Sequence, residues 1–205
     1  VQLRRLLREK ENGAPNHATI VVVGAGANGV ELIAEIGAVR NAFCAAQGMS
    51  TSAVRLVLCD SGSEPVSMFS AGVRKRVIKR FRALGIEFLG KTTIREVLPG
   101  EIRAEHVTIP FDLLIWSAGV KSRREPGEVW GLPVNERGRI AVANTFLRKG
   151  KKNIFALGDA VARGEGKSDP QSAQAASAQA PYVAKNILAL FAGKDLSDFS
   201  QYKWQ

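Results

Sequence analysis

The chain has 205 residues, of which 45% are hydrophobic, and it carries a formal net charge of +10 at pH 7. This composition is typical of globular domains with a packed core, and no apolar stretch is long enough to span a bilayer, so we expect any membrane contact to be peripheral. Basic clusters such as residues 74–76, 79–80 and 149–152 suit an anionic lipid surface or solvated helix faces, but no aromatic side chains are interleaved with them, so we expect no nucleic-acid partner.

The N-terminal part of the chain predicts a helix, a strand and a second helix. Residues 1–11 place leucines on one helical face and basic side chains on the other, and the turn residues 12–15 end this helix. Residues 20–23 are β-branched and apolar, which predicts a buried parallel strand. Helical apolar spacing then extends over residues 27–47.

The motif Gly24-x-Gly26-x-x-Gly29 joins this strand to the helix, and each glycine has a mechanical reason. Gly24 permits a tight turn, Gly26 lets a pyrophosphate approach the backbone, and Gly29 lets the helix pack closely on the strand. The helix N-terminus presents unpaired N–H groups and the positive end of its dipole to a phosphate. The motif therefore predicts a dinucleotide site, and a purely structural strand-turn-helix is the alternative.

A second strand over residues 54–60 completes a βαβ unit and ends in Asp60. This residue lies about 30 positions after Gly29, somewhat beyond the usual ~20 for the acidic residue that binds the ribose. Its carboxylate can accept hydrogen bonds from the adenosine ribose hydroxyls and would repel a 2′-phosphate. We therefore expect a preference for NADH over NADPH.

The remaining elements of this first domain follow from their end signals. Ser70 is a candidate N-cap for a helix that runs to Leu84 and stops at Gly85. Further strands are expected at residues 86–89, 94–98, 101–103, 107–109 and 113–116. The middle three read as an antiparallel meander in place of a crossover helix. The order predicts an α/β fold with a Rossmann-like nucleotide-binding domain.

The pattern resets after this domain. In order, we expect a connector, two strands, a Gly-rich polar loop and a long Ala-rich helix, over residues 121–127, 139–142, 153–157, 163–169 and about 172–190. The second strand is followed by Gly158 and Asp159, which places a carboxylate at the C-terminal end of a strand beside a glycine. The tail after Gly193 is expected to form no element.

The side chains that serve redox and metal chemistry elsewhere are sparse in this sequence. The two cysteines, Cys44 and Cys59, form neither CxxC nor CxxxxC, which argues against a disulfide reductase that uses its own thiols. We expect both to be buried and inert. The two histidines, His17 and His106, stand alone, so no metal site is expected.

Several motifs now fall in one order. They are GAGANGVE at 24–31, IWSAGV at 115–120, GLPV at 131–134, NIFALGDA at 153–160, AQ at 173–174 and YVAKNI at 182–187. Together they resemble the two-dinucleotide-domain flavoproteins of the pyridine nucleotide-disulfide oxidoreductase superfamily. Within it they look most like type II NADH dehydrogenase, the single-subunit NADH:quinone oxidoreductase, and the resemblance covers nearly the whole chain.

The resemblance also implies a domain organisation, because in that family the NAD(H) domain is inserted into the FAD domain. Residues 1–17 would be a helix and linker of the FAD domain, residues 18–120 the NAD(H)-binding domain, and residues 121–205 the C-terminal part of the FAD domain. The family's FAD fingerprint would precede residue 1 and its membrane-docking helices would follow residue 205. We therefore expect a fragment that does not retain FAD tightly by itself.

Motifs and resemblance together predict a set of site residues. Cofactor contacts are expected from Gly24, Gly26, Asn28, Gly29, Asp60, Gly119, Gly158, Asp159 and Ala173, and catalytic roles from Glu31, Gln174 and Gln179. By resemblance, Asp159 accepts a hydrogen bond from the FAD ribitol, and the helix that starts at Ala173 and Gln174 lies under the flavin ring, where its dipole stabilises reduced flavin. Glu31 would lie near the nicotinamide, although a Glu of this kind is more often a plain helix-surface residue.

One departure from the family pattern concerns the acceptor side. The family motif continues Ala-Gln-x-x-x-Gln-Gln-Gly, whereas this chain has Ala178, Gln179 and Ala180 at the last three positions. The first of the paired glutamines and the glycine are therefore missing. This departure weakens the prediction of a quinone acceptor and leaves the flavin and NADH predictions unchanged.

The function implied by the resemblance is hydride transfer from NADH to FAD, followed by two-electron reduction of a quinone. A flavin-dependent NADH oxidoreductase with another acceptor, or a non-catalytic NAD(H)-binding module, are the alternatives. The expected cofactors are FAD and NADH. We expect a cytoplasmic protein that is peripherally associated with an anionic membrane surface when full-length, and a homodimer is left open.

Overall fold

The computed structural model of the chain describes residues 18–120, 129–164 and 169–200. These residues belong to two compact units that divide between Gly119 and Val120, and each unit is described by itself. The helix predicted for residues 1–11 lies outside the described residues. None of the described helices is both long enough and apolar enough to cross a membrane.

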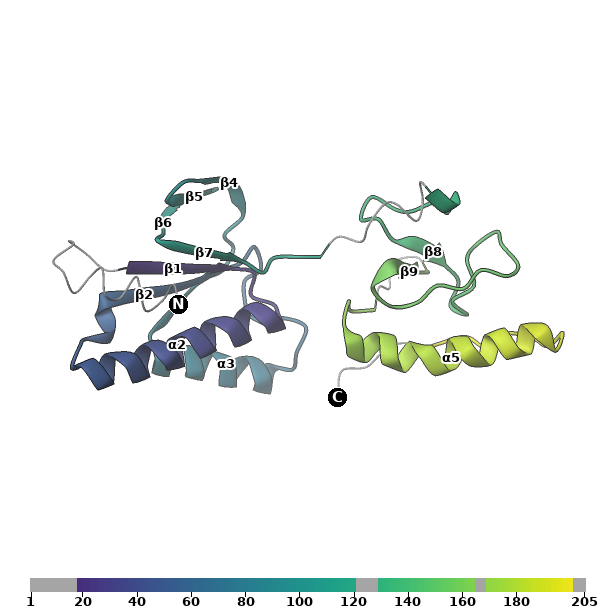
Figure 1. Cartoon of the computed structure of the whole chain (residues 1–205), viewed down its shortest axis with the longest axis horizontal. Coiled ribbons are helices and arrows are strands. Elements are labelled where there is room, and N and C mark those ends of the chain that lie inside the picture. The colour runs from purple at the N-terminus through teal and green to yellow at the C-terminus, as the bar shows by residue number, and fades with distance from the viewer. Residues whose placement is uncertain (1–17, 121–128, 165–168, 201–205) are drawn as a thin grey trace. The chain divides into compact units, whose positions relative to one another are not determined.

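A parallel sheet of four strands forms the centre of the first unit (Figure 1). In spatial order its strands are β3 (Ile86–Leu89), β2 (Val54–Cys59), β1 (Ala18–Val23) and β7 (Leu113–Trp116). All of β1 is buried, which explains why its sequence is a continuous apolar run and does not alternate. These four strands confirm the predicted strands of the Rossmann-like domain.

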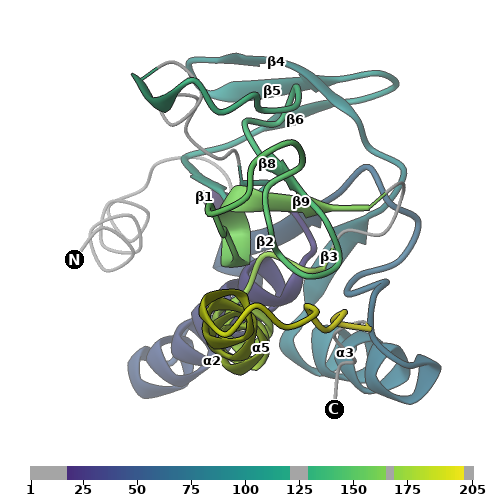
Figure 2. The ribbon, with the colours of Figure 1, turned by 90° about the vertical axis from the view of Figure 1, so that its right-hand side faces the viewer.

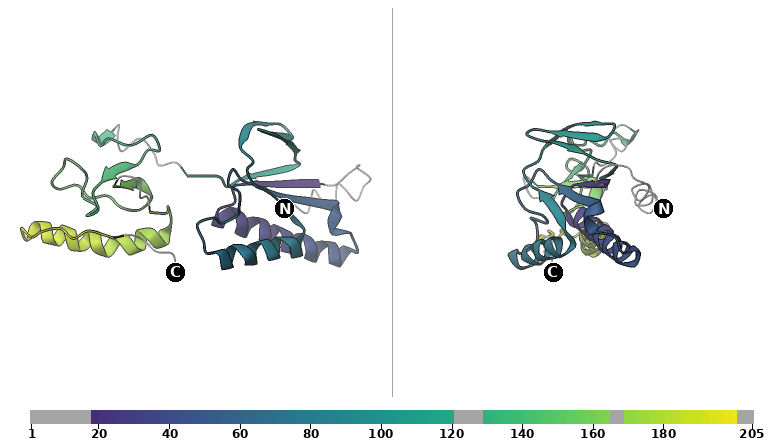
Figure 3. Two further views of the ribbon diagram at one scale, coloured as in Figure 1. Left: turned by 180° about the vertical axis from the view of Figure 1, so that it is seen from behind. Right: turned by 90° about the vertical axis from the view of Figure 1, so that its left-hand side faces the viewer.

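The two faces of this sheet are covered by different structures (Figure 3). The covering elements are the helices α2 (Ala27–Gln47) and α3 (Ala71–Leu84), the short 3-10 turn η1 (Thr51–Ala53), and the meander strands β4 (Ile94–Leu98), β5 (Glu101–Ala104) and β6 (Thr108–Pro110). Val22 and Leu58 belong to the apolar cluster that includes the two helices. Val21 and Val57 point to the other face, where they pack with Ile102 of the meander. The alternation follows from the two-residue period of a strand.

The helix boundaries agree with the predicted signals. Both helices end at glycines in the left-handed conformation, Gly48 with φ 65° and Gly85 with φ 61°. Ser70 occupies the N-cap position of α3, although its side chain makes no capping hydrogen bond. The antiparallel meander β4–β5–β6 also confirms the prediction.

A buried arginine of α2 ties three elements of this unit together. Arg40 is 3% exposed, and its guanidinium donates to the carbonyl of Val54 at 2.9 Å and to the carbonyl of Leu84, the last residue of α3. Burial lowers the pKa of Arg40 from its usual value. A cation at the C-terminal end of α3 also complements the dipole of that helix.

The second unit is built from a short parallel pair and a long helix (Figure 2). Strand β8 (Ile140–Val142) pairs with β9 (Val161–Arg163), the 3-10 turn η2 (Gly158–Ala160) precedes β9, and α5 (Ala173–Phe191) packs against this turn. Helix α5 confirms the predicted Ala-rich helix. Residues 192–200 form no helix or strand, as expected for the tail, but Phe199 is 6% exposed and packs in the core of the unit.

In this unit, β8 confirms the strand predicted at residues 139–142, one other predicted strand was wrong, and one observed strand was not predicted. Residues 153–157 do not form a strand, because they share only an isolated bridge between Leu147 and Phe155 before the chain turns at Gly158 with φ 71°. A strand requires a longer ladder of hydrogen bonds with a neighbour. Strand β9, directly before the loop predicted from residue 163, was not predicted, because its three residues are too few to show an apolar period.

Candidate nucleotide-binding site

The loops that follow β1, β2 and β7 meet at the C-terminal edge of the parallel sheet. The N–H of Gly24 donates to the carbonyl of Cys59 at 2.8 Å, and the N–H of Ser117 donates to the carbonyl of Val23 at 2.8 Å. In open α/β sheets, ligands bind outside the carboxyl ends of the strands. The glycine motif therefore lies at the edge where a nucleotide site is expected.

The three glycines of the motif differ in the space around them. A Cβ atom on Gly24, whose φ is +103°, would lie 2.8 Å from the backbone of Ala118, and a Cβ on Gly29 would lie 1.8 Å from the carbonyl oxygen of Gly24. A Cβ on Gly26 would meet nothing within 4 Å. Gly24 and Gly29 are thus required by packing of this chain against itself. Gly26 is not, and it leaves open space at the turn.

This open space adjoins the N-terminus of α2. Gly26 is the N-cap and has no side chain to cap the helix, and the first turn contains no acidic residue. Gly26, Ala27 and Asn28 are all exposed. The first N–H groups of a helix have no intrahelical partner, and the helix dipole places partial positive charge there. The end of α2 can therefore bind a phosphate through its backbone.

The carboxylate of Asp60 bridges the glycine turn and the loop that follows β2. One oxygen accepts from the N–H of Ala25 at 2.7 Å, and the other accepts from the N–H of Gly62 at 2.6 Å. The N–H of Val66 closes the same loop onto the carbonyl of Ala25 at 2.8 Å. A carboxylate offers about four acceptor positions, so these two bonds leave room for a ligand hydroxyl. The sequence did not predict that Asp60 fixes the turn as well.

Three more residues of this unit flank the edge. Gly119 follows β7, has φ +75° and is exposed with nothing within 4 Å of a built Cβ. Glu31 is exposed in the second turn of α2. Trp116 at the end of β7 is 55% exposed, and its indole N–H donates to the carbonyl of Ala118 at 3.1 Å. The sequence shows a Trp shortly before a glycine, at Trp116 and Gly119, but only the structure shows that this Trp is exposed at the candidate site.

The second unit brings together the predicted residues of its own site. Gly158 has φ +71° and starts η2, where Asp159 is exposed. The hydroxyl of Ser172 accepts from the N–H of Ala175 at 3.2 Å and caps α5. Ala173 and Gln174 are exposed in the first turn of this helix. Among the described residues, no group of His, Cys, Asp or Glu is arranged to hold a metal ion.

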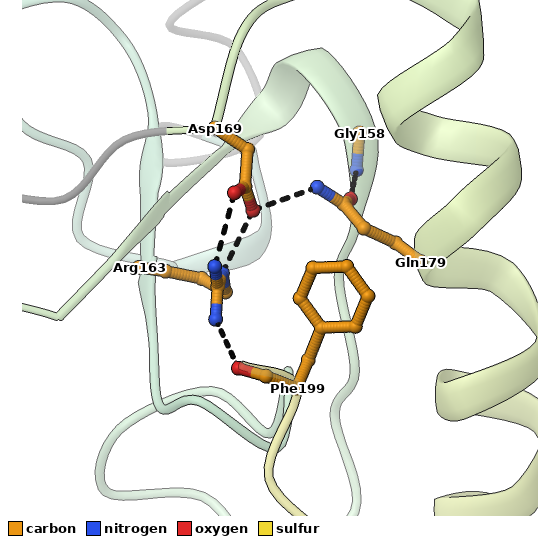
Figure 4. A network of polar contacts seen from close by, with 5 residues as sticks. All are labelled: Gly158, Arg163, Asp169, Gln179 and Phe199. Atoms are coloured by element: carbon orange, nitrogen blue, oxygen red, sulfur yellow. Dashed lines mark hydrogen bonds and ion pairs between the residues drawn. The ribbon is translucent and has the colours of Figure 1, made fainter. Parts of the chain in front are cut away.

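Gln179 occupies a different environment from Gln174. It is 1% exposed, its amide oxygen accepts from the N–H of Gly158 at 2.8 Å, and its amide nitrogen donates to Asp169 at 3.0 Å (Figure 4). Both ends of the amide are therefore engaged inside the unit. Ala178, one position earlier, is partly buried and packs against the apolar core.

These arrangements agree with the comparisons with known proteins. Residues 2–180 match the family described as pyridine nucleotide-disulphide oxidoreductase. The chain belongs to this family. The resemblance predicted from the motifs is thereby confirmed, and so is the Rossmann-like α/β fold class.

Two curated relatives that match this chain are described as type II NADH:quinone oxidoreductases. The chain is 31% identical over 195 residues to the enzyme from Haemophilus influenzae. This alignment covers 90% of the chain and 43% of the relative. The chain is 28% identical over 200 residues to the enzyme from Staphylococcus aureus, and this alignment covers 94% of the chain and 48% of the relative. The chain thus spans about half the length of the curated relatives it matches.

Two solved structures share the fold of this chain. A ferredoxin reductase from Rhodopseudomonas palustris aligns with a TM-score of 0.68 at 20% identity, over 98% of this chain and 46% of that chain. NDH2 from Plasmodium falciparum in complex with NADH aligns with a TM-score of 0.66 at 19% identity, over 78% of this chain and 36% of that chain. At these identities the likeness shows the fold of the chain alone.

Two polar arrangements of this oxidoreductase chain were missed by the sequence reasoning. The pairing of Arg163 with Asp169 joins residues six positions apart, and the bond between Gln179 and Gly158 joins residues 21 positions apart. Neither spacing carries a periodic signal. The only hint was a glutamine at a helix position whose neighbours are mostly small and apolar.

Proposed function

We propose that the chain is part of an NADH-dependent flavoprotein oxidoreductase that reduces a quinone. The observation that carries this proposal is the open space at Gly26, which adjoins an uncapped helix N-terminus and lies next to the Asp60 carboxylate. The proposal assigns residues 18–120 to the NAD(H)-binding domain, and residues 1–17 and 121–205 to the FAD domain. FAD, when bound, supplies the two-electron chemistry between NADH and the acceptor.

In this proposal the first unit binds NADH through its backbone and one carboxylate. The N–H groups at the start of α2, from Ala27 and Asn28, bind the pyrophosphate, and the missing side chain of Gly26 lets it approach. Asp60 accepts hydrogen bonds from the adenosine ribose, since it is already held in place by its two backbone donors. Glu31 lies farther along α2, toward the nicotinamide.

The second unit has the features of a flavin half-site. The positive φ of Gly158 favours glycine, so no side chain stands at this position of the turn. The neighbouring Asp159 is exposed, and its carboxylate can accept from the FAD ribitol. The capped N-terminus of α5 presents a positive dipole end at Ala173 and Gln174, which stabilises negative charge on a reduced ring. Gly119, in the first unit, is the remaining residue proposed to contact a cofactor.

The quinone assignment rests on the names of the relatives and on Gln174. Its exposed amide is available to an acceptor carbonyl, whereas position 178 carries a methyl group that packs inward. One amide in place of two weakens quinone binding by about 0.5–1.5 kcal/mol, which is several-fold in affinity. We therefore propose a quinone reductase with a raised KM for its acceptor.

A basic helix face supports peripheral contact with an anionic membrane surface. Five exposed basic residues of α3 form no ion pair with a described acidic residue: Lys75, Arg76, Lys79, Arg80 and Arg82. Each basic side chain near an anionic leaflet contributes about 1 kcal/mol, and the attraction falls with salt. Cosedimentation with phosphatidylserine vesicles that is lost by Lys79→Glu and Arg80→Glu tests this role. A homodimer stays a prediction.

The experiment that tests the function uses the purified complete protein. We expect a flavin absorbance band that NADH bleaches without oxygen and that a soluble quinone restores. Bleaching without restoration by any quinone would indicate a flavin enzyme with another acceptor. NADH binding by a protein without flavin would indicate a non-catalytic NAD(H)-binding module, and the proposed enzyme function would be wrong.

A further inference from the structure

A buried polar chain in the second unit runs from the tail of the described residues to the turn that carries Asp159 (Figure 4). Arg163 donates to the carbonyl of Phe199 at 2.7 Å and forms a two-bond ion pair with Asp169, at 2.9 and 3.0 Å. Asp169 accepts from the amide of Gln179, and Gln179 accepts from the N–H of Gly158. This network of hydrogen bonds thus ends at Gly158, the residue directly before Asp159.

The two partners of Gln179 fix the orientation of its amide. Gly158 offers an N–H, which requires the amide oxygen, and Asp169 offers a carboxylate, which requires the amide nitrogen. A carboxylate at position 179 could accept from Gly158 but would meet Asp169 with a second negative charge at about 3 Å. An apolar side chain would leave both partners without this bond. Only an amide serves both ends.

The end of this network that lies away from Gly158 is a buried ion pair between Arg163 and Asp169. The side chains of Arg163 and Asp169 are 4% and 7% exposed, and the guanidinium lies 4.9 Å from the ring centre of Phe199 and 5.4 Å from that of Phe146. A buried ion pair that is fully hydrogen-bonded in this way has a single low-energy arrangement. It therefore gives Gln179 a fixed partner from which to hold the turn.

We propose that Gln179 is a positioning residue, which Asp169 and Arg163 orient so that it holds the Gly158–Ala160 turn in the shape that binds flavin. This inference rests on the proposed function, and it deepens it by giving Gln179 a role through Gly158 that requires no contact with the acceptor. The Gln171 side chain also supports the turn by donating to the carbonyl of Asp159 at 3.1 Å, and the N–H of Val161 bonds to the carbonyl of Gly158, but only Gln179 binds the N–H of Gly158 through a side chain among the described residues. Loss of the bond from Gly158 changes the direction of the Asp159 carboxylate.

The test compares three forms of the complete protein with the wild type. Gln179→Met keeps the length of the side chain and removes both bonds. Gln179→Glu keeps the acceptor for Gly158 and adds the repulsion from Asp169. The double variant Gln179→Glu/Asp169→Asn removes this repulsion, places a donor opposite position 179 and restores the original net charge, while its amide oxygen keeps one of the two bonds to Arg163. Gln47→Met makes the same substitution as the first variant at an exposed helix end and is the matched control.

The measurements are the Kd of FAD, the KM of the quinone, and amide hydrogen exchange at Gly158, which requires no flavin. We expect Gln179→Met and Gln179→Glu to raise the Kd of FAD about tenfold and to speed exchange at Gly158 by a similar factor, and the double variant to recover part of both, because it removes the repulsion but weakens the pairing with Arg163. Gln47→Met should change neither. If Gln179→Met does not fold, the comparison of Gln179→Glu with the double variant decides the question.

A Gln179→Met protein that binds FAD as the wild type does, but has a raised KM for quinone, would overturn the positioning role in favour of direct acceptor contact. Unchanged exchange at Gly158 would refute the hydrogen bond itself. A wild-type complete protein that binds no flavin would instead refute the proposed function. The two failures are therefore distinguishable.

Discussion

Alanine substitutions at two glycines of the turn should separate ligand binding from folding. Gly26 has φ −69° and ψ −178°, which alanine adopts readily, and its Cβ would have no neighbour within 4 Å. A Cβ on Gly29 would lie 1.8 Å from the carbonyl oxygen of Gly24, whereas real Cβ contacts are not closer than 3.0 Å. Gly29→Ala therefore forces α2 away from β1, and Gly26→Ala forces no movement.

The magnitudes follow from these distances. Gly26→Ala replaces glycine with a less favourable N-cap residue and should lower the free energy of unfolding by about 1 kcal/mol or less. Its methyl group occupies the space that the pyrophosphate needs, so the Kd of NADH should rise about tenfold or more, equivalent to about 1.4 kcal/mol. Gly29→Ala overpacks the helix against the strand and should cost about 1–3 kcal/mol of stability or more.

The assay combines urea unfolding with the fluorescence of NADH on binding. Gly26→Ala should unfold near the wild-type midpoint and bind NADH poorly, while Gly29→Ala should lose stability first. Wild-type NADH affinity in a folded Gly26→Ala protein would show that the pyrophosphate does not lie at this turn. A Gly29→Ala protein with unchanged stability would contradict the close packing described for α2.

Three further predictions concern single side chains. Asp60→Ser should narrow the preference for NADH over NADPH, measured as the ratio of the two Kd values, because it removes the charge that opposes a 2′-phosphate. NADH binding should weaken by about 1.5–3 kcal/mol. A wild-type protein with equal affinity for NADH and NADPH would contradict this prediction. Arg40→Met should lower the free energy of unfolding by about 2–4 kcal/mol in urea, because two buried carbonyls lose their donor; a loss under about 0.5 kcal/mol would contradict the bridging role. Burial and, secondarily, the charge of Asp60 raise the pKa of Cys59 to about 11, so the folded state favours the protonated thiol. The wild type should therefore lose stability relative to Cys59→Ala as pH rises from about 9 toward 11. Parallel curves of unfolding free energy against pH for the two proteins would contradict this prediction.

The first unit could be predicted from the sequence almost element by element, because its boundaries are marked by residues with few alternatives. Gly85 stops α3 in the left-handed conformation, and the β-branched run before Gly24 forms a strand buried on both faces. Each signal is local, lying within a few residues of the boundary that it marks. The roles of Gly24 and Gly29 also followed from the motif alone, and the built Cβ distances agree with them.

The second unit was predicted less well, for the opposite reason. Its strands have three residues each, and residues 153–157 look like a strand in sequence but find only one bridge partner. The contacts of Arg40 with Leu84 and of Arg163 with Phe199 join residues 44 and 36 positions apart. Such contacts depend on the packed fold and leave no periodic trace in the chain.

The most direct test of the central claim is to map NADH binding on the chain residue by residue, by recording amide chemical shifts as NADH is added. We expect the largest changes at residues 24–29, with further changes at Asp60, Gly62 and Gly119, and in Gly26→Ala we expect the same positions to change only at NADH concentrations about tenfold higher or more. Saturable shifts confined to other parts of the chain, or no shifts at millimolar NADH, would contradict a nucleotide site at the glycine turn.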